Sequence, residues 1–170
     1  MSFENAKGYL LGKPNAGLKN MFVMMNEARI GVGVSALALS ERAYQTAISF
    51  VKDRRQSRSL DEKKQDLTKD ADNILVHPDV RRQLLEVKST NIAMRALVVY
   101  AAMLAQNKAA SSQARLALLI PIIKSYVSDR GVLNIDTCIQ VIGGSGYVKD
   151  WSLEQFFRDA RISRIYEGTN

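Results

Sequence analysis

Apolar residues recur every three or four positions along three long stretches of the chain, which is the spacing of one buried face on an α-helix. The stretches run from Leu18 to about Gln56, from Pro78 to about Asn107, and from about Ala114 to Ile142. Only three prolines occur in the 170 residues, so helices of this length are permitted. The pattern predicts an all-α fold with three long helices.

A fourth, shorter helix is expected near the end of the chain. Gly143 and Gly144 end the third pattern, because glycine readily stops a helix. The segment Ser152-Leu153-Glu154-Gln155 then matches a capping box, in which Ser and Glu side chains satisfy the free amides of a helix start. Short connections join the four elements. The predicted architecture is therefore an up-and-down four-helix bundle, with three long helices and one short C-terminal helix.

Several small or rigid residues lie inside the predicted helices. Gly31 and Gly33 each cost a helix about 1 kcal/mol, which favours a position where another helix must approach closely. Pro121 is expected to kink the third helix or to mark its first turn. Gly131 is expected to loosen the same helix.

The first residues do not follow the helical pattern. Residues 8–12 form a short extended piece between two glycines, and residues 13–17 are typical of a turn. A lone strand has no partner in a helical chain, so residues 1–17 are predicted to be the remnant of a preceding β domain. Residues 18–170 form the predicted helical domain. Residues 57–77 are polar and charged, which predicts a surface loop.

Composition and charge narrow the classes of function. Hydrophobic residues make up 46% of the chain, which is typical of a globular protein. The 24 Lys and Arg residues outnumber the 17 Asp and Glu residues, giving a net charge of +7. The basic residues are scattered and no basic stripe with interleaved aromatic residues occurs, so nucleic-acid binding is not expected. An anionic cofactor or substrate would account for selected arginines.

The single cysteine, the single histidine and the apolar runs bear on possible disulfides, metal sites, membrane spans and localisation. The one cysteine, Cys138, cannot form an intramolecular disulfide and is expected to be buried and inert. The one histidine, His77, precedes a helix start and is interpreted as a cap rather than a base, and no cluster has metal-ligand spacing. No apolar run approaches the roughly 20 residues of a membrane span. A soluble, cytoplasmic protein without a membrane span is expected.

The C-terminal residues gather glycine, arginine, aromatic and carboxylate side chains. Gly143-Gly144-Ser145-Gly146 lacks the ending of a phosphate-binding P-loop, so it either terminates a helix or lets backbone touch a ligand. Glu167 is either a general base or a solvated carboxylate. From these residues alone no reaction follows.

Three motifs in this region occur in a distinctive order and spacing. They are Gln140-Val141-Ile142-Gly143-Gly144-Ser145-Gly146-Tyr147, Arg158-Asp159-Ala160-Arg161-Ile162 and Ile165-Tyr166-Glu167-Gly168-Thr169. Together they resemble the C-terminal signature of the acyl-CoA dehydrogenases. Residues 26–30 and 54–56 are similar to the two ends of the first C-terminal helix in that family. Residues 74–82 are similar to a bacterial branch of broad acyl-CoA dehydrogenases.

The resemblance implies a whole protein that uses FAD to introduce an α,β double bond into an acyl-CoA thioester. An electron-transfer flavoprotein or another acceptor would then take the electrons, and a homo-oligomer, dimer or tetramer, is expected. The chain would comprise the tail of the middle β domain and the C-terminal bundle, cut after the catalytic motif. Such a fragment is expected to be inactive alone. The alternative left open by the residues is a non-catalytic helical assembly or interaction module.

The resemblance also implies roles for single residues. Glu167 matches the base that removes the α-proton while a hydride passes to the flavin, and Gly168 matches a glycine whose backbone approaches the substrate. Thr169 matches a flavin contact, and Arg29 lies near the thioester pocket. Residues implied to bind the FAD of a neighbouring subunit are Arg54 at the pyrophosphate and Gln140, Gly143 and Gly144 on the adenosine side. Ser57-Arg58 departs from the family's usual Phe-Gly after the Arg-x-Gln pattern, and the bacterial branch has Gly-Arg here.

Overall fold

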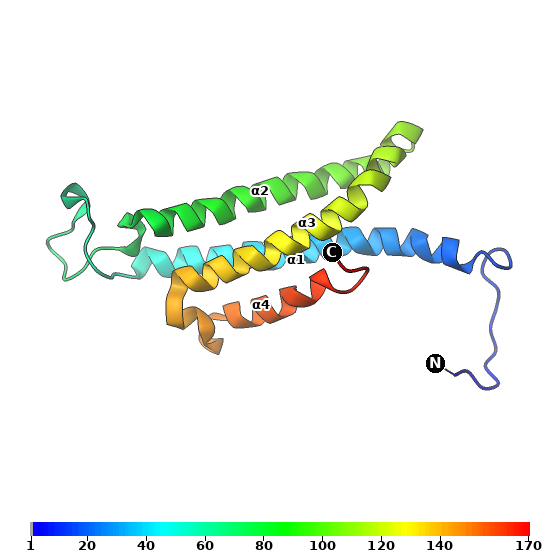
Figure 1. The fold of residues 1–170 in the computed structure, drawn as a ribbon, viewed down its shortest axis with the longest axis horizontal. Helices are drawn as coiled ribbons and strands as arrows, with labels where there is room; N and C mark the ends of the chain where they lie inside the picture. The colour runs from blue at the N-terminus through cyan, green and yellow to red at the C-terminus, as the bar shows by residue number, and fades with distance from the viewer. Residues whose placement is uncertain (1) are drawn as a thin grey trace.

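The computed structural model describes residues 2–170, and these residues form helices and loops without any strand. The four α-helices are α1 (Gly17–Asp53), α2 (Pro78–Gln106), α3 (Ala110–Ile142) and α4 (Leu153–Arg161). Successive helices run in opposite directions along an elongated bundle (Figure 1). The prediction of an up-and-down four-helix bundle is therefore confirmed.

Five short 3₁₀ turns connect or extend these helices in the described part of the chain. They are η1 (Glu62–Lys64), η2 (Ile74–Val76), η3 (Gly143–Tyr147), η4 (Lys149–Trp151) and η5 (Ile162–Arg164). The turns η3 and η4 reverse the chain after α3, so that α4 returns along the bundle (Figure 1). The turn η5 leads into the C-terminal strip, which we define as residues 165–170.

The helices α1 and α3 make the most extensive contact in the bundle and approach closely where they cross. A Cβ atom added at Gly131 of α3 would lie 3.0 Å from the carbonyl oxygen of Ala36 in α1. A Cβ atom added at Gly33 of α1 would lie 2.7 Å from Cγ2 of Ile123 in α3. The expectation of close approach is thus correct for Gly33 and wrong for Gly31, where an added Cβ atom would meet nothing within 4 Å. The expectation that Gly131 loosens α3 is wrong. Gly131 instead allows the two backbones to touch.

A buried polar cluster joins the three long helices at mid-bundle. Ser40 of α1 donates its hydroxyl proton to Oδ1 of Asn91 in α2 across 2.6 Å. The side-chain amide of Asn134 in α3 donates to the same Oδ1 at 3.0 Å and to the Ser40 hydroxyl at 3.1 Å. Because buried polar atoms need hydrogen-bond partners, these bonds fix the register of the three helices along the bundle.

The helix ends differ from the sequence-based expectations in two places. The helix α3 begins at Ala110, so Pro121 lies inside it rather than in its first turn. Ser152 does precede α4, but it has left-handed backbone angles and its side chain makes no capping hydrogen bond. A capping serine normally has extended backbone angles, so the predicted capping box does not form. The turn η4 comes directly before Ser152 and accounts for this geometry.

The isolated histidine and cysteine occupy structural positions. His77 is the N-cap residue of α2, and its ring Nε2 lies 3.0 Å from the carbonyl oxygen of Gln56. Cys138 is fully buried in α3, and burial raises the pKa of its thiol to about 12. The predicted burial of this thiol is therefore confirmed, and a raised pKa is typical of an unreactive cysteine. Among the described residues, no group of three or more His, Cys, Asp or Glu side chains could hold a metal ion.

Residues 2–16 lie outside the bundle, without helix or strand (Figure 1). The predicted turn forms, because the amide of Ala16 donates to the carbonyl oxygen of Lys13 at 3.2 Å. Most residues of this segment are exposed, including 98% of Tyr9. Its assignment to a preceding β domain stays a prediction.

One of the described helices, α1, is long and apolar enough to cross a membrane by length and composition alone. The expected absence of a membrane span is therefore not borne out by this test. Core helices and signal sequences near the N-terminus pass the same test, and 22% of the apolar window of α1 is buried in the bundle.

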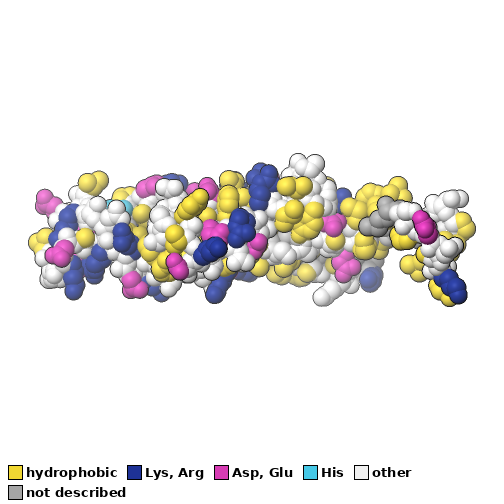
Figure 2. Space-filling view, turned by 90° about the horizontal axis from the view of Figure 1, so that it is seen from below, with side chains coloured by type: hydrophobic (Ala, Val, Ile, Leu, Met, Phe, Trp, Pro, Cys, Tyr) yellow, Lys and Arg dark blue, Asp and Glu magenta, His cyan; other side chains and the backbone are white. Residues whose placement is uncertain are grey.

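Charge is dispersed over the face seen in Figure 2. Lys and Arg side chains lie among Asp and Glu side chains along this face, and no continuous basic stripe runs along it. This view agrees with the scattered distribution of basic residues along the sequence.

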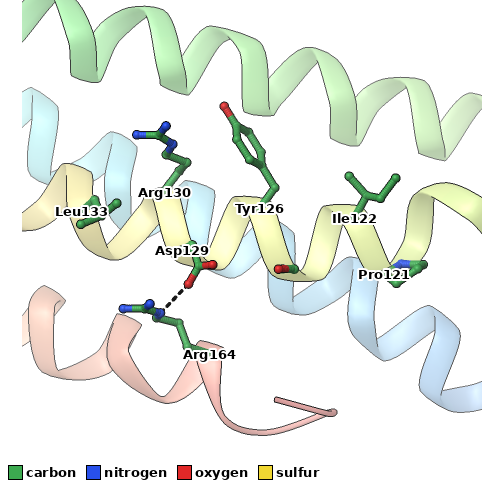
Figure 3. Close-up of a pocket in the computed structure, with 8 residues that line it drawn as sticks. Pro121, Ile122, Tyr126, Asp129, Arg130, Leu133 and Arg164 are labelled. Atoms are coloured by element: carbon green, nitrogen blue, oxygen red, sulfur yellow. Dashed lines mark ion pairs between the residues drawn. The ribbon is translucent and has the colours of Figure 1, made fainter. Parts of the chain in front are cut away.

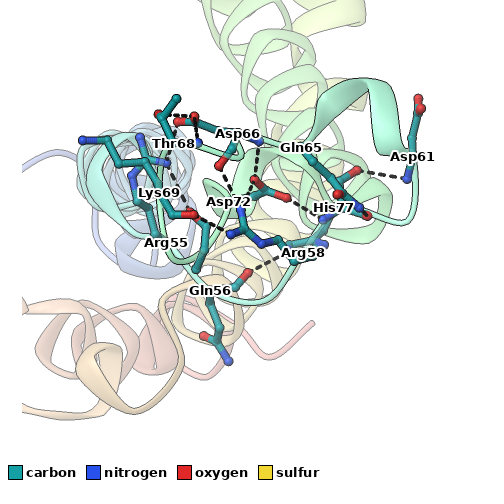
Figure 4. Close-up of polar contacts among 12 residues, drawn as sticks. Arg55, Gln56, Arg58, Asp61, Gln65, Asp66, Thr68, Lys69, Asp72 and His77 are labelled. Carbon is teal, nitrogen blue, oxygen red and sulfur yellow. Dashed lines mark hydrogen bonds and ion pairs between the residues drawn. The ribbon is translucent and has the colours of Figure 1, made fainter.

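The loop between α1 and α2 is held together by one buried carboxylate (Figure 4). Asp72 accepts hydrogen bonds from the backbone amides of Ser59 and Asp66, both at 2.7 Å. The guanidinium of Arg58 completes the set at 3.2 Å. The backbone amides, followed by Arg58, hold the pKa of Asp72 below its usual range. The predicted surface loop therefore has an ordered interior.

We expect the variant Asp72→Asn to lower the free energy of unfolding near pH 7 and to matter less in acid. The folded pKa of Asp72 is depressed, so its stabilisation is present above the unfolded pKa of about 3.9 and is lost as the pH falls through the folded pKa. Urea unfolding at neutral and acidic pH measures this difference. A gap between wild type and variant that widens in acid would contradict the assignment.

Candidate active site

The C-terminal strip folds back onto the middle of the bundle and contacts α1 and α3 (Figure 1). The guanidinium Nε of Arg29 in α1 donates to the carbonyl oxygen of Glu167 at 3.1 Å. From α3, the ammonium of Lys124 donates to the carbonyl oxygen of Gly168. Residues far apart in the sequence are thus joined around one short turn.

The end of the strip is fixed by a second set of hydrogen bonds. Lys124 Nζ donates to Oδ1 of Asn170 at 2.7 Å. The amide Nδ2 of Asn170 donates to the hydroxyl of Ser128 at 2.8 Å and to the carbonyl oxygen of Ser125 at 3.2 Å. Because Ser125 and Ser128 lie on α3, as Lys124 does, the end of the strip is attached to about one turn of that helix.

The turn at Glu167 has an uncommon backbone. Glu167 has φ 57° and Gly168 has φ 96°, so two successive residues occupy left-handed conformations. Glycine takes this conformation at little cost, whereas a residue with a side chain pays about 1–2 kcal/mol. Such strain persists only where the surroundings impose it, and it gathers at functional sites.

Glu167 is half-buried in this turn. Within residues 2–170, its carboxylate forms neither a hydrogen bond nor an ion pair. A carboxylate with unused acceptor positions can take a proton from a bound molecule. The geometry therefore permits the general-base interpretation of Glu167.

An open hollow of about 670 Å³ lies beside the strip on α3 (Figure 3). Arg164 of η5 forms an ion pair with Asp129 of α3 along its edge, at 2.5 Å. The other lining residues come from α3 and are mostly apolar. The ion pair attaches η5 to α3 directly before the strip, three residues from Glu167.

The other predicted site residues lie at a different place. Arg54 directly follows α1, while Gln140 lies in the last turn of α3 and Gly143 is its C-cap. Gly144 comes next, and all these residues are exposed. The helical rise places Gly143 about 28 Å along α3 from Lys124. The structure therefore separates the predicted residues into a turn group near the middle of the bundle, with Arg29, Glu167, Gly168 and Thr169, and an end group at the C-terminal ends of α1 and α3.

The end group is open for a ligand. A Cβ atom added at Gly143 or Gly144 would meet nothing within 4 Å, so a molecule could reach their backbone. Arg54 forms no ion pair with any residue between 2 and 170, and its guanidinium donates only to the Gln56 side chain at 3.4 Å. An exposed guanidinium and glycine backbone open to a ligand are both features that suit a phosphate-bearing cofactor. Ser57 has φ 61°, which explains why glycine suits this position.

A comparison with protein families matches residues 15–170 to the C-terminal domain of acyl-CoA dehydrogenases. The chain belongs to the acyl-CoA dehydrogenase family. Members of this family are flavoproteins that use FAD. The resemblance seen in the sequence is confirmed.

Two curated acyl-CoA dehydrogenases are similar over almost the whole chain. The 3-methylmercaptopropionyl-CoA dehydrogenase of Ruegeria pomeroyi is 41% identical over 99% of the chain. The broad-specificity linear acyl-CoA dehydrogenase FadE5 of Mycobacterium tuberculosis is 35% identical over 96%. The chain spans 29% and 28% of the length of these two relatives.

A solved acyl-CoA dehydrogenase has the same bundle. Butyryl-CoA dehydrogenase from Megasphaera elsdenii superposes with a TM-score of 0.78 at 28% identity. The match covers 94% of the chain and 37% of the solved protein. The helical architecture described above is thus that of an acyl-CoA dehydrogenase C-terminal domain.

Sequence reasoning missed Lys124, Ser128 and Asn170. A signal for Lys124 was present, because it interrupts the apolar side of the third helix between Ile120 and Val127. A cation at such a position must find acceptors inside the protein. The sequence alone does not show that these acceptors belong to the C-terminal strip.

Proposed function

We propose that the chain is the C-terminal part of an FAD-dependent acyl-CoA dehydrogenase that forms an α,β double bond in an acyl-CoA thioester. The observation that carries the proposal is the Glu167 turn, in which the carboxylate is half-buried with free acceptor positions and two cations hold the backbone carbonyl oxygens of Glu167 and Gly168. Family membership supports this interpretation. The non-catalytic module remains the second interpretation that the experiments below distinguish.

In the proposed reaction, the Glu167 carboxylate takes the α-proton of the thioester. Bound FAD would supply the acceptor for the β-hydrogen, which leaves as a hydride, so that the loss of a proton and a hydride gives the substrate one carbon–carbon double bond. The backbone of Gly168 is proposed to border the substrate next to Glu167, because glycine has no side chain that would keep the substrate away. Arg29 donates a hydrogen bond to the carbonyl oxygen of Glu167 and so helps to hold the turn. Its proposed position near the thioester pocket is compatible with this contact.

The end group is proposed to bind the FAD of a neighbouring subunit. Arg54 would pair with the pyrophosphate, and Gln140, Gly143 and Gly144 would border the adenosine. Thr169 would contact the flavin that serves Glu167. The separation of about 28 Å along α3 supports assigning the two groups to different FAD molecules. A homo-oligomer, dimer or tetramer, follows from this arrangement, with an electron-transfer flavoprotein or another acceptor as the redox partner.

The full-length protein should be yellow when purified. We expect its flavin absorbance to bleach when an acyl-CoA, such as butyryl-CoA or 3-methylmercaptopropionyl-CoA, is added without oxygen. A protein that purifies with FAD but is bleached by no acyl-CoA would favour the non-catalytic interpretation.

The 170-residue chain alone is expected to bind little FAD and to show no dehydrogenation. It spans 29% of the most similar curated relative mentioned above, and its end group lies exposed at the tip of the bundle. Absorbance of the purified chain near the flavin bands measures bound cofactor. A spectrum with stoichiometric flavin would contradict the expectation.

A further inference from the structure

Lys124 and Asp72 are the two charged residues that are buried in the described part of the chain. Lys124 is 4% exposed and lies on α3 where the strip crosses it. No carboxylate among residues 2–170 lies within ion-pair distance of its ammonium. Its partners are instead the carbonyl oxygen of Gly168 and the side chain of Asn170.

A buried ammonium without a carboxylate is costly unless its protons are used in hydrogen bonds. Burial accordingly lowers the pKa of Lys124. A methionine or leucine would fill a core position of this size without that cost. The structure thus places a costly cation where its hydrogen bonds reach the backbone next to Glu167.

Two cations hold two successive carbonyl groups of the turn. Arg29 reaches the carbonyl of Glu167 from α1, and Lys124 reaches the carbonyl of Gly168 from α3. Both turn residues have left-handed backbones, which would relax if the carbonyls were free. Without these two hydrogen bonds the turn could relax from its left-handed angles, and a change in φ at Glu167 would turn its side chain away from its present direction.

We propose that Lys124 is a positioning residue, which fixes the Glu167–Gly168 turn and thereby aims the Glu167 carboxylate at the substrate α-carbon. The inference rests on the proposed function, because it takes Glu167 as the base. Lys124 itself touches no reacting atom in this scheme. Its effect is exerted through orientation, and a displacement of about 1 Å in a reacting group can cost about 10²-fold in rate.

The test compares Lys124→Met with wild type in the full-length, FAD-loaded protein. The rate of flavin bleaching after anaerobic mixing with butyryl-CoA or 3-methylmercaptopropionyl-CoA is expected to fall about 10–100-fold. FAD content and the thermal midpoint should be unchanged or higher, since the variant removes a buried charge. Lys88→Met, at an exposed lysine of α2, is the matched control and should keep the wild-type rate.

A double variant separates positioning from a general structural role. If Lys124 acts only through Glu167, adding Lys124→Met to Glu167→Gln should cause no further loss of rate. An additional loss of tenfold would overturn the inference. Partial recovery in Lys124→Arg, which keeps donors at this place, would support it.

The outcomes distinguish this inference from the proposed function. A wild-type rate in Lys124→Met together with a slow Glu167→Gln would sink the role of Lys124 and leave the proposed function intact. Normal turnover by Glu167→Gln would sink the proposed function itself. If Lys124→Met fails to retain FAD, Lys124→Gln serves as the second variant, since its shorter amide keeps polarity but loses reach. A wild-type rate in that variant would likewise overturn the inference.

Discussion

Replacing Glu167 by Gln in the full-length, FAD-loaded protein should lower the rate of acyl-CoA dehydrogenation by about 10²–10⁴-fold. The amide is nearly the same size as the carboxylate but cannot take the α-proton. The Glu167 carboxylate has no hydrogen bond or ion pair among residues 2–170, so the change breaks no internal contact of its side chain. Stopped-flow bleaching of the flavin measures the loss, and flavin absorbance before mixing shows that FAD is retained.

The control for this experiment is Glu62→Gln, an exposed carboxylate in the loop between α1 and α2. It carries the same loss of charge away from the turn and should keep the wild-type rate. Glu167→Asp should fall between the two, because its carboxylate is one methylene short of its present reach. Equal rates for Glu167→Gln and Glu62→Gln would show that Glu167 is not the base.

The largest expected effect on stability comes from Gly131→Leu. The first carbon of the new side chain would lie 3.0 Å from the Ala36 carbonyl oxygen and 3.2 Å from the Ala36 Cβ. Backbone atoms cannot give way as a flexible side chain does, so α1 and α3 must separate. We expect the free energy of unfolding to fall by about 1–3 kcal/mol or more, as measured by urea unfolding.

Gly31→Leu provides the matched comparison. Gly31 lies in α1, and a Cβ atom there meets nothing within 4 Å. Leucine is the better helix former, so this variant should be neutral or more stable by up to about 1 kcal/mol. If both variants lost the same stability, helix contact at Gly131 would not be the cause.

These glycines show what periodicity can and cannot predict. Repeats of apolar residues located the three long helices, since a buried face depends on sequence spacing alone. The position of α4 came instead from the glycines that end α3 and from the expected cap at Ser152. The same reasoning gave Gly33 its close contact but misread Gly131, because the partner of a small residue is set by the crossing of two helices. Ser152 was also misread, since its cap geometry depends on the preceding turn η4.

The candidate site was predictable in part for a similar reason. The motifs identified Glu167, Gly168 and Arg29, and the structure brings these three together. Their chemical roles stay predictions until the variants are measured. Lys124 escaped notice because its partners are a carbonyl group and an amide 44 and 46 residues away, and neither carries a sequence signal for a buried lysine.

The order of the helices has a consequence for synthesis on the ribosome. The most extensive partner of α1 is α3, although α2 lies between them in the sequence. At usual translation speeds, the stretch from Asp53 to Ile142 takes on the order of ten seconds to appear. Throughout that interval the apolar side of α1 has no α3 to cover it. The newly made chain should therefore be a substrate for chaperones that bind exposed hydrophobic helices.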